Sequence, residues 1–253
     1  GTWQTRVNDQ WNFGRELIYG TPGNNPELIR FAARLPMVLF FLIGAWLVFH
    51  WSRKLYGDTA ALIAIILYSL SPTILAHAHF VATDVAALAG VLTATYAYLR
   101  YLQKPSGYRL LVASVVLGLA LLTKFSTFLL IPFFILVAVA WYIVNPPPNG
   151  LRYTLRIAAL LVGAFVLIVW PVYNLHIINY PIARQQSDTT QLLSYYGNTK
   201  ISKIVIAAAG TPVIRGLAQY ATGLVMADQR VSGGSPAFFF GKIYDFGHWA
   251  YFP

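Results

Sequence analysis

Three ionisable side chains, His77, His79 and Asp84, lie close together between two long apolar stretches of the sequence. An ionisable group at the end of a membrane helix is costly unless it meets water, a partner or a ligand. Imidazole and carboxylate groups in such a position could bind a metal ion or relay protons. The cluster therefore marks a candidate working site.

The spacing of the two histidines constrains the backbone that carries them. Metal ligands on one helix prefer a separation of three or four residues, whereas His77 and His79 are two apart, which suits an extended or turn segment. Pro72 permits an irregular helix end here. A second interpretation stays open, in which the histidines lie at the lipid headgroup level and Thr83 or Asp84 caps the following helix.

Two cations extend the candidate site. Lys124 interrupts an apolar stretch from Tyr108 to Val144, and a lysine there is costly unless it reaches the membrane surface or pairs. It is either such a surface anchor or a fixed cation that faces an anionic ligand, because lysine serves as a point charge on phosphate. Arg34, at the start of the first predicted span, either holds a phosphate bidentately or anchors to headgroups.

The composition defines the class of protein. Of 253 residues, 57% are hydrophobic and only 10% are charged, whereas soluble domains carry about 25% charged residues. The chain is therefore predicted to be an all-α, multi-pass integral membrane protein, which we expect in a bacterial or archaeal plasma membrane. It has no cysteine and a net charge of +10. The basic residues are spread among loops, so the expected partners are membrane lipids and anionic ligands, and not nucleic acid.

Apolar runs of suitable length predict a polytopic helical bundle of about six transmembrane helices. The run from Tyr108 to Val144 exceeds one crossing of a ~30 Å core, which favours two short spans that meet in a tight hairpin at Lys124. The six predicted spans are about 35–51, 60–75, 84–102, the two within 108–144, and 155–178. The predicted domains are an extracytoplasmic loop segment (1–34), the transmembrane bundle (35–178) and an extracytoplasmic or interfacial segment that leads to a further span (179–253). Within the last, 201–225 is predicted to be an amphipathic interfacial helix.

The basic residues also predict the orientation. Seven of them lie in the three loops that join spans one to two, three to four and five to six, namely Arg53, Lys54, Arg100, Lys104, Arg109, Arg152 and Arg156. The two short loops on the other side hold only Lys124. Basic short loops are cytoplasmic, so the histidine–aspartate cluster, Lys124 and both terminal segments are predicted to be extracytoplasmic. Four arginines, Arg6, Arg15, Arg30 and Arg34, run against this count.

A set of short motifs in a fixed order carries a family resemblance. They are Trp11-Asn12-Phe13-Gly14-Arg15-Glu16, Gly23-Asn24-Asn25-Pro26, Ala33-Arg34-Leu35-Pro36, Ser71-Pro72, Ala76-His77-Ala78-His79, Thr83-Asp84, Leu122-Thr123-Lys124-Phe125-Ser126 and Trp249-Ala250-Tyr251-Phe252-Pro253. The order resembles membrane glycosyltransferases of the protein O-mannosyltransferase and aminoarabinose-transferase type. These enzymes have the GT-C fold and form glycosyltransferase family 39.

The resemblance implies an inverting hexosyl- or mannosyltransferase that works on the extracytoplasmic face. Its donor would be a polyprenyl- or dolichyl-phosphate sugar, and its acceptor a protein or lipid. It implies Lys124 and Arg34 as contacts to the donor phosphate, Asp84 as an acidic residue of the central cavity, and His77 and His79 as cavity-lining residues. No residue set is assigned to a metal, and a divalent metal ion is the one cofactor left open.

One departure from the family pattern affects the mechanism. The family carries an Asp-Glu pair in its first extracytoplasmic loop, which supplies the catalytic carboxylate. The early acids Asp9, Glu16 and Glu27 form no such pair, so we expect an internal part of a longer chain, with the pair upstream of residue 1. The competing interpretations are a non-catalytic membrane subunit or scaffold of a larger complex, derived from a glycosyltransferase, and, last, a transporter.

Overall fold

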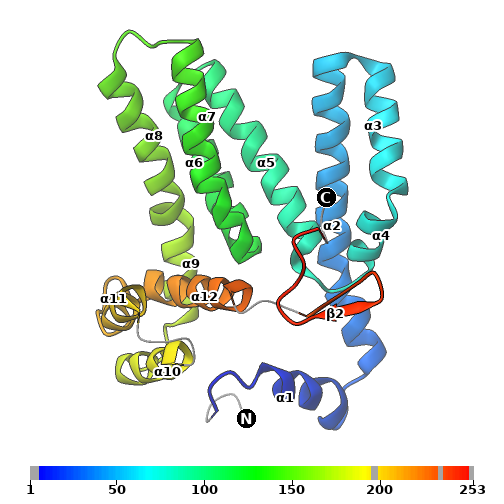
Figure 1. The fold of residues 1–253 in the computed structure, drawn as a ribbon, viewed down its shortest axis with the longest axis vertical. Coiled ribbons are helices and arrows are strands. Elements are labelled where there is room, and N and C mark those ends of the chain that lie inside the picture. Colours follow the sequence, from blue (N-terminus) through cyan, green and yellow to red (C-terminus); the bar gives the residue numbers. More distant parts are fainter. Residues whose placement is uncertain (1–5, 195–198, 233–235, 251–253) are drawn as a thin grey trace. The chain divides into compact units, whose positions relative to one another are not determined.

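The computed structural model describes residues 6–194, 199–232 and 236–250. These residues form helices and one short hairpin, in two compact units, Gly1–Val169 and Trp170–Pro253. The first unit carries every residue of the predicted site. Figure 1 shows the elements of both units in sequence colours.

The first unit is entirely helical in its described part. Its apolar helices run up and down beside one another, joined by short connections (Figure 1). In order, the elements are α1 (Gln10–Arg15), the π-helix η2 (Glu16–Gly20), α2 (Pro26–Tyr56), α3 (Asp58–Leu70), α4 (Pro72–His79), α5 (Thr83–Gln103), α6 (Gly107–Thr123), the 3-10 helix η3 (Phe125–Leu129), α7 (Leu130–Val144), α8 (Gly150–Ala164) and the π-helix η4 (Phe165–Val169).

These helices confirm an all-α polytopic membrane protein. Four helical runs are long and apolar enough to cross a membrane, and a fifth crossing results if α3 and α4 count as one bent span. With α6, a shorter apolar helix, the described residues supply the six predicted spans. The first membrane-spanning helix, α2, begins at Pro26, before the predicted start near Leu35. Asn25 caps it by accepting hydrogen bonds from the Glu27 and Leu28 amides, so the helix extends past the apolar run that marked the span.

The second predicted span is broken. Helices α3 and α4 meet at Ser71 with a bend of 53°, because Pro72 cannot donate the hydrogen bond that would continue α3. Proline fits the first turn of a new helix, and both histidines lie within α4. The extended or turn segment predicted for His77 and His79 was therefore wrong, because the alanine-rich sequence after Pro72 favours a helix.

The hairpin at Lys124 is confirmed. Helix α6 ends at Thr123, and Lys124 is fully extended, with φ −160° and ψ 143°. The chain then turns through η3 into α7. Two short helices thus replace one overlong helix, and Lys124 is the residue at the break.

Small residues allow the central helices of the first unit to pack closely. A Cβ added at Gly90 of α5 would lie 3.2 Å from the Ala120 Cα of α6. One added at Gly118 would lie 2.6 Å from the Ile168 Cβ and 2.7 Å from the Ala164 carbonyl oxygen. The contacts at Gly118 leave no room for a methyl group, and a methyl group at Gly90 would be tight. Since α5 carries Asp84 and Lys124 directly follows α6, this packing fixes the distance between the two.

The second unit comprises α9 (Trp170–His176), α10 (Ile182–Ser194), α11 (Lys200–Ala209), α12 (Arg215–Ser232) and a hairpin of β1 (Ala237–Phe239) and β2 (Lys242–Tyr244). Residues 201–225 thus belong to two helices, and the single amphipathic helix predicted there was wrong. Pro212 lies in the break between them, where a proline interrupts a helix.

Hydrogen bonds from two side chains, Arg215 and Tyr180, help to hold the second unit together. The buried Arg215 guanidinium donates to the carbonyl oxygens of Ile177 and Tyr180. The Tyr180 hydroxyl donates to Asp188 at 2.5 Å. Burial and this neighbouring carboxylate raise the pKa of Tyr180 well above its ordinary value, so the phenol keeps its proton at physiological pH.

Candidate functional site

The centre of the candidate site is an ion pair between Lys124 and Asp84. The Lys124 Nζ donates to the Asp84 Oδ1 at 2.5 Å, although the two residues lie forty positions apart in sequence. Each side chain is 40% exposed. The pair is thus formed at a helix end where both groups stay accessible, and its unlike charges reduce the cost of keeping either one near lipid.

His77 completes the cluster from the other side of the carboxylate. Its Nδ1 lies 3.3 Å from the Asp84 Oδ2. Both Asp84 oxygens are therefore engaged, one by the lysine and one by the imidazole. In consequence the carboxylate is held in a fixed orientation and holds the ammonium group of Lys124 in turn. We call Asp84, Lys124 and His77 the acid–lysine cluster.

Three separate elements position this cluster. Asp84 lies in the first turn of α5, where the helix dipole favours a negative charge. The predicted capping role for Thr83 or Asp84 was wrong, because no side chain caps this helix and its N-cap residue is Ala82. His77 comes from α4, which contacts α5, and Lys124 follows α6.

A threonine fixes the break that carries Lys124. The buried Thr127 hydroxyl lies 2.9 Å from the Ala120 carbonyl oxygen and 2.6 Å from that of Lys124. The Thr123 hydroxyl donates to the same Ala120 oxygen at 2.6 Å. These hydroxyls satisfy carbonyl groups that the end of α6 leaves without helical partners. Sequence reasoning noted this polar interruption but gave the threonines no role, although hydroxyl residues beside a helix break are the available signal.

The other two predicted site residues lie outside the cluster. His79 is on the same short helix as His77, but its ring contacts Phe80, with centroids 5.9 Å apart. Arg34 lies within α2, half-buried, and has no hydrogen-bond or ion-pair partner among the described residues. Helix α2 contacts both α4 and α5, so Arg34 is on a helix adjacent to the cluster, but among the described residues it makes no hydrogen bond or ion pair with the cluster.

The acid–lysine cluster does not fit a divalent metal ion. In the part of the chain that the structure describes, no group of three or more histidine, aspartate or glutamate side chains converges as metal ligands would. The Lys124 ammonium already occupies the Asp84 Oδ1, and a second cation beside it would be repelled. The divalent metal ion therefore stays a prediction, and the described residues offer no set of side chains that would bind it.

The cluster is instead suited to an anion. A lysine ammonium has three N–H donors, and Asp84 accepts one of them. The remaining donors and the exposed part of the side chain are available to an approaching group. A phosphate that binds Lys124 meets a cation whose position is fixed before binding, which lowers the entropy that binding costs.

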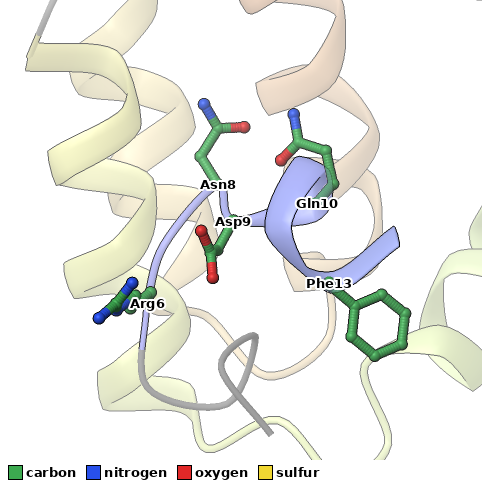
Figure 2. A pocket seen from close by; sticks show the side chains of 5 residues that line it. All are labelled: Arg6, Asn8, Asp9, Gln10 and Phe13. Carbon is green, nitrogen blue, oxygen red and sulfur yellow. The ribbon is translucent and has the colours of Figure 1, made fainter. Parts of the chain in front are cut away.

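A separate hollow lies at the start of the first unit. Figure 2 shows its lining side chains, Arg6, Asn8, Asp9, Gln10 and Phe13, with Phe13 pointing away from Arg6. The Asp9 carboxylate accepts a hydrogen bond from the Asn12 amide at 2.7 Å. Asp9 thus stabilises the first turn of α1, and none of the predicted site residues lines this hollow.

The fold and the site define a polytopic helical membrane protein with a cation–carboxylate pair at one end of its helices. The family model for dolichyl-phosphate-mannose-protein mannosyltransferase matches residues 29–173, which is more than half of the chain. The chain therefore belongs to this family of membrane glycosyltransferases. No curated protein and no solved structure matches it. The matched region includes the whole acid–lysine cluster and Arg34.

Of the motifs that carried the resemblance, most lie within described elements. The last one, at the C-terminus, lies partly outside the described residues, which end at Ala250. Of its described residues, Trp249 is 91% exposed.

Proposed function

We propose that the chain belongs to a glycosyltransferase that uses a polyprenyl-phosphate sugar, such as a dolichyl-phosphate mannose, and works on the extracytoplasmic face. The observation that carries the proposal is the Lys124–Asp84 pair, at 2.5 Å and half-exposed at the end of apolar helices. A donor of this kind has its lipid in the membrane and its phosphate at the surface. A fixed cation at a helix end meets that phosphate at the right depth.

The transfer step requires stabilisation of the negative charge on the leaving lipid phosphate. The acceptor oxygen, from a protein or lipid hydroxyl, forms a bond to the anomeric carbon of the sugar as the bond from that carbon to the phosphate oxygen breaks. The electron pair stays on the lipid phosphate, and the acceptor proton passes to a carboxylate base. Attack from the side opposite the phosphate inverts the anomeric configuration. Lys124 stabilises the charge that develops on the phosphate.

Asp84 acts in this proposal as a positioning residue. Both of its oxygens are engaged, by Lys124 and His77, so we assign the proton-accepting role to another carboxylate. Asp84 keeps the lysine extended toward the donor, and His77 keeps Asp84 in place. His79 is assigned to the lining beside Phe80.

Arg34 is proposed as a second contact to the donor phosphate. A half-buried guanidinium without a partner among the described residues is suited to bidentate phosphate binding. It lies on α2, which packs against the two helices that carry Asp84 and His77. Two cations from different elements would hold the phosphate in one orientation, as in-line displacement requires.

The test is transfer activity of the full-length protein, purified from membranes, with a polyprenyl-phosphate mannose donor and a hydroxyl-bearing acceptor peptide. Lys124→Ala is expected to lower kcat about 10²–10³-fold, the usual effect of removing one donor to a developing anion. Lys124→Arg should retain part of the activity because it keeps the charge. Lys104→Ala, a basic residue at the other end of α5, is the control and should match the wild type. Wild-type turnover by Lys124→Ala would overturn the proposal and favour a non-catalytic subunit.

A further inference from the structure

A hollow of about 170 Å³ lies between α2 and α5, remote from the acid–lysine cluster. Arg100, in the last turn of α5, lines it, whereas Asp84 lies in the first turn of the same helix. At 1.5 Å per residue the two are separated by roughly 24 Å along the axis. The hollow is therefore a separate feature of the molecule.

Two cations line this hollow without a carboxylate. Lys54 and Arg100 contribute to its wall, and neither has an acidic partner among the described residues. The neighbouring basic residues differ, because Arg53 pairs with Asp58 at 2.5 Å and Arg109 donates to the Lys104 carbonyl oxygen at 2.7 Å. Two like charges around one hollow repel each other, and an anion between them removes that repulsion.

The rest of the wall is mostly aromatic and apolar. Trp51 and Tyr96 contact each other edge to face, with ring centroids 5.4 Å apart. The Lys54 Nζ lies 6.0 Å from the centre of the Tyr96 ring, which directs this ammonium toward the hollow's wall. Leu55, Leu99 and Gln103 complete the lining, and Leu55 is 59% exposed. Aromatic rings beside two cations and an exposed leucine are typical of the headgroup layer of a membrane.

We propose that this hollow binds the headgroup phosphate of an anionic phospholipid. Lys54 and Arg100 hold the phosphate, Trp51 and Tyr96 form the wall at headgroup depth, and the exposed leucine lies along the acyl chain. The apolar part of the lining selects a lipid over free phosphate, because free phosphate would leave the leucine and the rings exposed. The site is independent of the glycosyl-transfer chemistry proposed above.

The test is native mass spectrometry of the full chain, released from detergent, with phosphatidylglycerol or phosphatidylcholine added. The wild type should retain phosphatidylglycerol in preference to phosphatidylcholine. The double variant Lys54→Gln/Arg100→Gln should bind phosphatidylglycerol about 30-fold more weakly, since each basic residue near an anionic lipid surface contributes about a fivefold factor. The matched control is Lys104→Gln/Arg152→Gln, which removes the same charges from exposed positions outside the hollow and should bind as the wild type does.

Three outcomes would overturn the proposal. The first is equal retention of the two lipids by the wild type. The second is equal loss of phosphatidylglycerol in the double variant and the control, which would indicate general charge attraction. The third is displacement of the bound lipid by millimolar inorganic phosphate, which would make the hollow a site for free phosphate. A thermal shift with each lipid checks that both double variants are folded.

Discussion

The two ends of α5 differ in how the nearby cations are neutralised. At its first turn, the Lys124 ammonium is matched by the Asp84 carboxylate at 2.5 Å. At its last turn, Lys54 and Arg100 line a hollow with no carboxylate partner among the described residues. The comparison indicates that the first end keeps its cation in a fixed position by an internal partner. The second end depends on the surrounding lipid for its counter-charge.

This difference has a functional consequence. A cation with an internal counter-ion is stable before any ligand arrives, and a passing phosphate exchanges with part of that contact. A cation without an internal counter-ion keeps an anionic lipid bound as long as the membrane contains that lipid. The first arrangement suits turnover of a substrate, and the second suits a resident lipid. Variants at the two ends of α5 and in the helices that pack around it test this contrast.

Removal of the carboxylate at the paired end should have the largest effect. Asp84→Ala frees Lys124, and a misplaced phosphate ligand lowers the transfer rate of the full-length enzyme about 100-fold. Because Asp84 acts through Lys124, the loss should lie in kcat as well as in the KM for the donor lipid. Asp84→Glu should recover part of the rate. An unchanged rate in Asp84→Ala would remove Asp84 from the account.

A single methyl group where α6 packs against α8 and η4 should reduce stability. Gly118→Ala places a Cβ 2.6 Å from the Ile168 side chain and 2.7 Å from a backbone oxygen, and such overpacking costs about 1–3 kcal/mol. Gly107→Ala is the matched control, because nothing lies within 4 Å of its added Cβ. Thermal unfolding in detergent measures both. Equal melting temperatures would show that α6 has room to move.

The threonine at the hairpin should have a smaller effect. Thr127→Val keeps the shape but removes the hydroxyl beside the Ala120 and Lys124 carbonyl oxygens, which costs about 1 kcal/mol. Since this hydroxyl fixes the break that carries Lys124, the KM for the donor should rise several-fold. A variant that loses stability with no change in KM would separate the hairpin from phosphate binding.

Loss of the exposed ion pair between Arg53 and Asp58 should have the smallest effect. Arg53→Gln breaks the ion pair with Asp58. The Arg53 and Asp58 side chains are 58% and 73% exposed, and such surface pairs contribute about 0–1 kcal/mol to stability. Neither transfer activity nor phosphatidylglycerol retention should change. A clear loss of lipid binding would show that the hollow extends beyond Lys54 and Arg100.

Much of this organisation was predictable from the sequence. The apolar runs and the lysine at position 124 predicted the bundle and the hairpin, because hydrophobic length is a strong signal in membrane chains. The pairing of Lys124 with Asp84 was not predicted, since it depends on how α5 packs against α6 through Gly90 and Ala120. The helix around His77 was missed because the two-residue spacing of the histidines favoured an extended segment, although Pro72 is suited to the first turn of a new helix.

The central claim is that Lys124 binds the phosphate of the lipid donor. Its most direct test is the affinity of the full-length protein for polyprenyl phosphate without a sugar, measured for the wild type and for Lys124→Met, which keeps the apolar stem. The variant should bind at least about tenfold more weakly than the wild type, as expected for loss of a hydrogen bond to a charged group. The Lys104→Met control should bind as the wild type does. Equal affinity of Lys124→Met and the wild type would contradict the account.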